Sequence, residues 1–293
     1  MLVALCCVGR LENRYAREFV EYYLNLSFDH IFIYDNNEPT EDNFLDVIGD
    51  YVEQDKVSII PWNHSHSHIQ RKIYQDCWKN NRDTYDWLAF FDFDEFLTLT
   101  NHVDIKDYLS DSTFDDYDMI HFNWMGYNDN NLIRYDDRGV LERFIQPYNF
   151  DFKKKYAFPE NNHIKSMIRC CTKGRVDWER ANNPHTPKNS IQCCNNKGDK
   201  CDSNSPFVKY NFDWAYIKHF STKTIEEWLT NKLKRGLLEQ PRTQDITKDL
   251  SLDVFFTVNE ISEEKINFIS EFHEKSVKKY QDIQLFLEKN QKK

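Results

Sequence analysis

Short apolar runs separated by helical segments recur through the first 125 residues, and this alternation constrains the fold more than any other feature. Helical spacing of aromatic residues predicts a helix over Arg14–Leu26 with Asn13 as its N-cap, and a second helix is expected over Ile69–Trp78. This order of elements predicts an α/β fold with a doubly wound, mostly parallel sheet. The runs expected to form buried strands are Leu2–Val8, Ile31–Tyr34, Val57–Ile60, Trp87–Phe91 and Met119–Phe122.

The pattern becomes irregular after about residue 126. Turn-forming residues are frequent there, and the stretch 150–210 holds several prolines and a cysteine-rich insert. Helical spacing returns at Thr224–Leu238 and again from Ser262 onward. These expectations divide the chain into a main domain over 1–240, an irregular subregion at 126–210 within it, and a C-terminal helical extension at 241–293.

Charge and composition exclude several classes of protein. Lys and Arg number 38 against 48 Asp and Glu, and the net charge of −10 argues against nucleic-acid binding. No apolar run approaches the roughly eighteen residues of a membrane span. The apolar start Met1–Val8 lacks the basic residues and cleavage site of a signal peptide, so we expect a cytoplasmic protein or a domain separated from an anchor. The lysine-rich end offers an alternative, peripheral association with the inner face of a membrane.

Two groups of cysteines and histidines could bind a metal ion, but for each we favour an ordinary loop. Cys193, Cys194 and Cys201 lie in a polar insert, and zinc binding with His185 as a further ligand is one interpretation. Because the insert has no Cys-x-x-Cys pair, we expect instead an ordinary loop with free thiols or one local disulfide. Alternating histidines at 64, 66 and 68 could bind zinc, but their polar neighbours favour a loop before a helix.

Three carboxylates follow the fourth apolar run, at a place where chemistry is expected. In open α/β sheets, ligands bind beyond the carboxyl ends of the strands. Because side chains alternate along a strand, Asp92 and Asp94 should face one side and Glu95 the other. Two neighbouring carboxylates repel unless a cation neutralises them, so this pattern predicts Mn²⁺ or Mg²⁺ bridging substrate phosphates. The alternative is an acidic strand end that caps a neighbouring helix.

Four segments follow one another along the chain in a recognisable order. They are Arg10–Asn13 with a helix ending at Asn25–His30, Ile33–Asn37, Leu88–Leu97, and Tyr216–Phe220 followed by Lys223, Thr224, Lys232, Arg235 and Gly236. In this order they resemble the GT-A glycosyltransferases, in particular the bacterial family-2-like enzymes related to glycosyltransferase family 92. The likeness extends over roughly residues 2–240 and is poor at 126–210, where acceptor specificity should lie. It implies a GT-A fold, which is a Rossmann-like, mostly parallel sheet flanked by helices, with an irregular acceptor-side subregion and C-terminal helices.

The resemblance implies a nucleotide-binding group. Asp35 resembles the acid that holds the nucleoside, and a carboxylate accepts hydrogen bonds well from ribose hydroxyls or a base N–H. Asn13 lies on the same side, where it could instead serve only as an N-cap. Gln70 and Arg71 could contact the base or the pyrophosphate, or simply form a solvated helix start.

The resemblance also implies a metal and diphosphate group. Asp92 and Asp94 would hold the metal and the diphosphate, with Asp94 as the direct ligand. His219 resembles the later histidine that completes metal coordination, and its alternative is a core histidine at a strand end. Lys165 and Lys223 could neutralise the diphosphate, or be merely exposed.

The implied reaction moves a hexose from a nucleotide sugar, with UDP-sugars favoured, to a hydroxyl of a saccharide or lipid-linked acceptor, as in polysaccharide biosynthesis. In inverting families a carboxylate deprotonates the acceptor. We name Asp129 as the candidate base. Trp124 and Tyr127 could stack on a sugar ring or belong to the core, and His185 could line this side. Competing bases are Asp136, Asp137, Glu142, Asp177 and Glu179.

Three other functions fit parts of the sequence. A phosphatase of the haloacid-dehalogenase type also uses an Asp-x-Asp pair, but it expects Thr or Val where Phe96 stands. A sugar nucleotidyltransferase expects a glycine-rich, basic loop after the first strand, whereas this loop has one glycine and the acid Glu12. A non-catalytic carbohydrate-binding GT-A module is disfavoured by the intact Asp92, Asp94 and His219.

Overall fold

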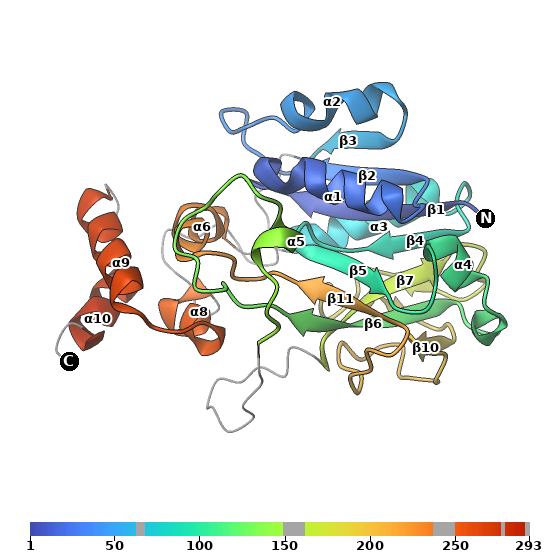
Figure 1. Cartoon of the computed structure of the whole chain (residues 1–293). Helices are drawn as coiled ribbons and strands as arrows, with labels where there is room; N and C mark the ends of the chain where they lie inside the picture. Colours follow the sequence, from blue (N-terminus) through green and yellow to red (C-terminus); the bar gives the residue numbers. More distant parts are fainter. Residues whose placement is uncertain (63–67, 149–161, 237–249, 277–278, 291–293) are drawn as a thin grey trace. The chain divides into compact units, whose positions relative to one another are not determined.

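The chain divides into two compact units in the computed structural model. The first comprises Met1–Met125 with Glu160–His219, and the second comprises Gly126–Pro159 with Phe220–Lys293. The division at residue 240 stays a prediction. His64 and His66 lie outside the residues that the structure describes, which are 1–62, 68–148, 162–236, 250–276 and 279–290 (Figure 1).

One mixed sheet forms the body of the first unit. Among the described residues nine strands join it, in the order β3-β2-β1-β4-β7-β6-β11-β5, with β10 paired to β6. The strands β1 to β4 pair in parallel, whereas β7 runs antiparallel to both β4 and β6. The strands are β1 (Val3–Gly9), β2 (His30–Asp35), β3 (Val57–Pro61), β4 (Trp87–Phe90), β5 (Glu95–Leu99), β6 (Met119–Gly126), β7 (Ile164–Arg169), β10 (Cys193–Asn195) and β11 (Ala215–His219).

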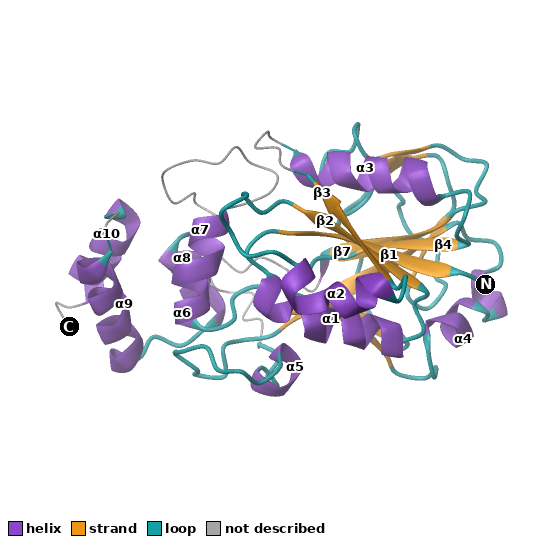
Figure 2. Cartoon of the chain, turned by 90° about the horizontal axis from the view of Figure 1, so that it is seen from above, coloured by secondary structure: helices purple, strands orange, loops and turns teal. Residues whose placement is uncertain are grey.

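This sheet confirms the predicted α/β class. The five apolar runs form β1, β2, β3, β4 and β6. Strands β1, β2 and β4 are buried because helices cover both faces, whereas β3, at the edge of the sheet, is only partly buried. Helix α3 (Ile69–Asn81) lies on one face, and α1 (Asn13–Asn25) and α2 (Leu45–Glu53) lie on the other (Figure 2). Smaller elements of this unit are α4 (Ile105–Leu109), the 3-10 turn η1 (Ser112–Phe114), β8 (Val176–Asp177) and β9 (Lys188–Asn189).

Helix α1 packs through the aromatic residues that its spacing predicted. Tyr15, Phe19 and Tyr23 are buried, and the rings of Phe19 and Phe93 lie 4.7 Å apart. The helix begins at Asn13 itself, so the prediction of Asn13 as N-cap is wrong. Glu12 occupies the cap position without a side-chain cap bond.

The second unit is helical around its own apolar core. The predicted helix from Thr224 begins there, but it passes from α6 into a π-helical turn before α7. The predicted closing helix starts after Ser262, whose side chain caps it. In the described parts of the chain, no helix combines the length and the apolarity needed to cross a membrane. The helices are α5 (Val140–Arg143), α6 (Ile225–Glu227), η3 (Trp228–Lys232), α7 (Leu233–Arg235), α8 (Leu252–Val258), α9 (Glu263–Lys275) and α10 (Gln281–Asn290).

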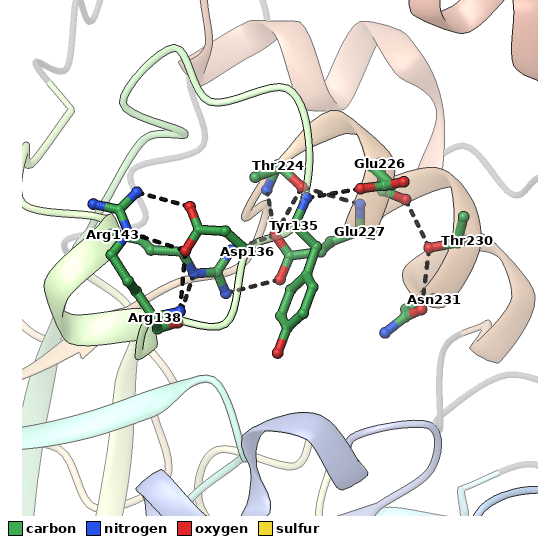
Figure 3. A network of polar contacts seen from close by, with 9 residues as sticks. All are labelled: Tyr135, Asp136, Arg138, Arg143, Thr224, Glu226, Glu227, Thr230 and Asn231. Atoms are coloured by element: carbon green, nitrogen blue, oxygen red, sulfur yellow. Dashed lines mark hydrogen bonds and ion pairs between the residues drawn. The ribbon is translucent and has the colours of Figure 1, made fainter.

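A buried polar network joins α5 to α6 within this unit (Figure 3). The Arg143 guanidinium donates two hydrogen bonds to the Glu227 carboxylate, at 2.8 and 3.0 Å, and both side chains are almost fully buried. Such a bidentate pair is among the stronger charge-assisted contacts. Glu227 also completes a capping box with Thr224, so one carboxylate serves both the ion pair and the start of the helix.

Candidate active site

The chain turns sharply after β4, at the predicted carboxylates. The strand ends at Phe90, and β5 begins at Glu95. The Glu95 N–H donates to the Asp92 carbonyl at 3.0 Å, and the Asp92 N–H donates to Glu95 Oε2 at 2.8 Å. The expectation that the three carboxylates alternate along a strand is therefore wrong, because the backbone between them forms a turn. This turn changes which carboxylates can act together.

Asp94, Glu95 and His219 form one buried group. One potential ligand atom from each lies within 4.8 Å of the others, and His219 Nε2 is 3.9 Å from Asp94 Oδ1. The sheet explains this proximity, since β11 pairs antiparallel with β5 and places His219 directly opposite Glu95. The sequence analysis named Asp94 and His219 together as metal ligands. It did not include Glu95, because the assumed alternation along a strand placed this side chain on the opposite face.

The Glu95 carboxylate has one oxygen that no described residue satisfies. It is fully buried, and its Oε1 has no hydrogen-bond partner among the described residues. Burial raises the pKa of Glu95 well above its usual range, although the nearby Lys165 ammonium opposes this shift. A buried, unpartnered carboxylate oxygen is costly unless a cation satisfies it. Two carboxylates and an imidazole form a donor set that can hold a divalent ion with oxygen preference, such as Mn²⁺.

Asp92 has a different environment from Asp94. Its carboxylate accepts hydrogen bonds from Lys165 Nζ at 2.8 Å, from Gln70 Nε2 at 2.5 Å and from the Tyr74 hydroxyl at 3.1 Å. Lys165 is fully buried; burial by itself lowers its pKa, but Asp92 and Glu95 outweigh this and raise it. The structure thus brings the predicted residues Gln70, Asp92 and Lys165 together, and the ammonium of Lys165 neutralises Asp92.

The predicted nucleotide residues follow the neighbouring strands β1 and β2. Asn37 links them: its backbone N–H donates to Asp35 Oδ1 at 2.9 Å, and its side-chain amide donates to Asn13 Oδ1 at 3.4 Å. Burial raises the pKa of Asp35. Since Asp35 and the Asp92 turn both follow parallel strands of one sheet, they share the edge where ligands bind in such folds. Arg71 is buried and donates to the Ala181 carbonyl.

Three histidines surround Trp124. Its ring centroid lies 4.0 Å from that of His219, 5.2 Å from His163 and 5.1 Å from His185. Burial lowers the pKa of His163 to about 4, and burial together with Lys165 lowers that of His185 well below its usual range. Both rings are therefore neutral at neutral pH, and they pack on Trp124, which in turn contacts His219. His163 was missed, and only its position two residues before Lys165 hinted at it.

The remaining predicted residues belong to the second unit. Asp129 is buried, its carboxylate lies 2.5 Å from Lys265 Nζ, and its Oδ1 accepts from the Asn131 N–H. Burial raises the pKa of Asp129, and the Lys265 ammonium opposes this shift. These contacts tie the turn at Asp129 to α9, and its role as a base stays a prediction. Tyr127 packs 5.0 Å from Phe220, and Lys223 is buried directly before the N-cap Thr224.

The competing bases are held by basic side chains or lie exposed. Asp136 pairs with Arg138 at 2.7 Å, and this contact lowers the pKa of Asp136 to about 2, which makes it a weak base. Asp177 lies 2.5 Å from Arg175, and Glu179 lies 3.6 Å from Lys79 at the surface. Asp137 and Glu142 are both exposed.

Comparison with known proteins adds to this geometry. The family model for glycosyltransferase family 92 matches residues 5–254. A glycosyltransferase family 92 protein of Oryza sativa subsp. japonica is 25% identical over 111 residues, and one of Ricinus communis is 28% identical over 109 residues. Each match covers 36% of this chain but only 18% of the plant protein.

Solved structures give a weaker likeness. S. aureus TarS is 15% identical over 43% of this chain and 22% of that chain, with a TM-score of 0.33. A shorter form of TarS, in complex with UDP-GlcNAc, is 15% identical over 46% of this chain and 37% of that chain, with a TM-score of 0.34. A likeness at this level supports no further conclusion.

Proposed function

Because this chain belongs to glycosyltransferase family 92, we propose that it transfers a hexose from a nucleotide sugar to a hydroxyl of a saccharide or lipid-linked acceptor. The family resemblance favours a UDP-sugar as donor. The observation that carries the proposal is the turn after β4, which gathers Asp94, Glu95 and His219 at the carboxyl edge of the sheet. Sugar transfer from a nucleotide needs the departing diphosphate to be stabilised, and this edge is suited to it.

Asp94, Glu95 and His219 would hold one divalent ion, Mn²⁺ or Mg²⁺. When bound, the ion would act as a Lewis acid on the departing diphosphate. The unpartnered Oε1 of Glu95 supports this assignment, since a cation would satisfy an oxygen that has no hydrogen-bond partner in the described structure. His219 supplies an imidazole nitrogen, and the pairing of β11 with β5 places this residue directly opposite Glu95.

The chain's own residues would position the donor. Asp35 would accept hydrogen bonds from the ribose or the base, and Asn37 fixes its carboxylate through a backbone N–H. Lys165 lies 2.8 Å from Asp92 and 3.6 Å from Glu95, so a fixed positive charge stands beside the expected diphosphate. Gln70 orients Asp92 in turn, which keeps that carboxylate directed toward Lys165.

Inversion at the sugar carbon requires a base on the acceptor side. We retain Asp129 as the candidate and expect Asp129→Asn to slow transfer without reducing donor binding, because a base acts on the acceptor hydroxyl. Peripheral membrane association, through the lysine-rich end of the chain, is likewise a proposal.

The proposal is tested by release of nucleoside diphosphate from a panel of nucleotide sugars with Mn²⁺. The native chain should release it from at least one donor, and Asp94→Asn should lose most of this activity. Asp83→Asn, which changes an aspartate that is 94% exposed, is the matched control and should keep it. Equal activity in Asp94→Asn would overturn the assigned site. Phosphate release from sugar phosphates, with no reaction on any nucleotide sugar, would instead favour a phosphatase.

A further inference from the structure

A second group of metal-ligating side chains lies where the cysteine insert meets β6. Strand β10 pairs in parallel with β6 and places Asn195 opposite His121. The chain then turns back, so that Cys201 lies opposite Cys193 and its N–H donates to the Cys193 carbonyl at 3.0 Å. Because side chains alternate along strands, this register directs His121, Cys193 and Cys201 to one face and Cys194 to the other.

The potential ligand atoms of these three residues converge. They all lie within 4.8 Å of one another, and the two sulfur atoms are 3.2 Å apart as free thiols. Two thiolates on one tetrahedral zinc ion would lie about 3.8 Å apart, from a Zn–S distance of about 2.3 Å. A small outward movement of the sulfurs would therefore accommodate the ion. The histidine beside the sulfur pair is His121, and not His185 as the sequence suggested.

The hydrogen bonds of Ser166 fix the protonation of His121. The Ser166 hydroxyl has one hydrogen and donates it to the His185 carbonyl at 2.7 Å. Its second contact, 3.0 Å from His121 Nδ1, must therefore have the ring N–H as donor. The hydrogen is then on Nδ1, and Nε2 carries the lone pair. A second hydrogen bond of this kind on the far nitrogen accompanies almost every histidine that binds a metal.

The Nε2 atom of His121 is the ring nitrogen left to bind an ion, because Nδ1 contacts Ser166. The residue is fully buried, and Nε2 has no hydrogen-bond partner in the part of the chain that is described. Burial lowers the pKa of His121 to about 4, although the backbone and then the charge of Asp202 oppose the shift, so the ring is neutral at neutral pH. A neutral ring with a free lone pair is the form that binds a metal.

We propose that His121, Cys193 and Cys201 bind one Zn²⁺ ion. Two thiolates and an imidazole favour zinc over Mg²⁺ or Mn²⁺, which prefer oxygen. Binding forms two Zn–S bonds and one Zn–N bond and releases the two thiol protons to solvent. Cys201 is partly exposed and lines a cleft of about 730 Å³, so the ion can enter there and water can fill the fourth position. The ion would fasten the loop of residues 193–201 to the edge of the sheet.

The test measures metal rather than activity. The chain is purified under reducing conditions, incubated with excess Zn²⁺ and desalted, and its zinc is measured by mass spectrometry. The measurement is made in Asp94→Ala, in which the other proposed metal site is disabled. About one ion per chain is expected in this variant, and close to none when Cys201→Ser or His121→Gln is added to it. Cys194→Ser is the matched control, because it alters the adjacent thiol on the opposite face, and it should keep the ion.

Two further measurements separate a zinc ligand set from a merely structural cluster. Replacement by Co²⁺ should give the visible bands of thiolate-bound cobalt in the native chain and lose them in Cys201→Ser. Ser166→Ala should weaken zinc binding by about 10- to 100-fold, because it removes the acceptor that holds the ring. The proposal fails if the reduced chain takes up neither ion, or if Cys201→Ser binds zinc as the native chain does. A Cys193–Cys201 disulfide in the chain purified under reducing conditions would also overturn it.

Discussion

Glu95→Gln tests the assigned metal ligands through stability as well as through binding. The native carboxylate is buried beside Asp92 and Asp94, and one of its oxygens has no partner in the described structure. Glutamine keeps the shape and removes the charge that burial and the neighbouring carboxylates disfavour. Replacing this charged, partly unsatisfied group by a neutral one should stabilise the fold by about 1–2 kcal/mol. In buffer without added divalent cations, the melting temperature of Glu95→Gln should therefore rise by roughly 2–8 °C.

The raised pKa of Glu95 also predicts how the stability of the native chain changes with pH. Because burial raises the pKa of Glu95, folding favours the protonated carboxyl. This contribution is fully present below the ordinary value of 4.5 and is lost as the pH rises through the raised pKa of the folded state. Thermal unfolding measured from pH 5 to pH 8 should therefore show a steeper fall in the native chain than in Glu95→Gln.

Addition of Mn²⁺ should make the native chain more stable than Glu95→Gln. An ion at 100 times its Kd stabilises the native chain by about 2.7 kcal/mol, and the variant should lose most of this gain. Glu179→Gln, which changes an exposed glutamate, should leave both measurements within about 0.5 kcal/mol of the native chain. If Glu95→Gln is less stable than the native chain without cations and responds equally to Mn²⁺, Glu95 is a structural residue and the assignment is incorrect.

Three further substitutions test other parts of the structure. Lys165→Met leaves Asp92 and Glu95 without their buried ammonium group. In the absence of divalent ions it should reduce the free energy of unfolding by about 3–5 kcal/mol, and Mn²⁺ should restore part of this loss. An unchanged urea unfolding curve would contradict this prediction. Arg143→Met should reduce the free energy of unfolding by a similar amount, and adding Glu227→Gln should recover most of this loss. Additive losses in the double variant would show that the two residues do not act as a pair. Thr224→Ala removes the capping box and should lower stability by about 1 kcal/mol, while Thr224→Ser should retain it; equal losses in a thermal scan would exclude the cap.

The strands that can be predicted from this sequence are those with an apolar run, and all of them except the edge strand β3 are largely buried. Their apolar runs are short and bounded by polar residues, and five of them form β1 to β4 and β6. Strand β7 was missed because Lys165 and Ser166 lie within it. Both are fully buried, but the partners that make this tolerable, Asp92 and His121, are far away in the sequence.

The residues of the two candidate metal sites could likewise be predicted from the sequence only in part. Asp94 and His219 could be named together from an ordered resemblance, and the pairing of β5 with β11 brings them close. Glu95 could not be named, because its direction depends on a turn that the apolar pattern does not reveal. His121 was likewise invisible beside Cys193 and Cys201, since only the register of β10 on β6 brings them together.

Calorimetric titration of UDP, with and without Mn²⁺, tests the central claim most directly. The account predicts that the native chain binds UDP more tightly when Mn²⁺ is present and that Asp94→Ala loses this dependence. Binding of another nucleoside diphosphate with the same metal dependence would keep the enzyme class and change the donor. If no nucleoside diphosphate binds the native chain with any divalent ion, the proposed nucleotide-sugar site is contradicted.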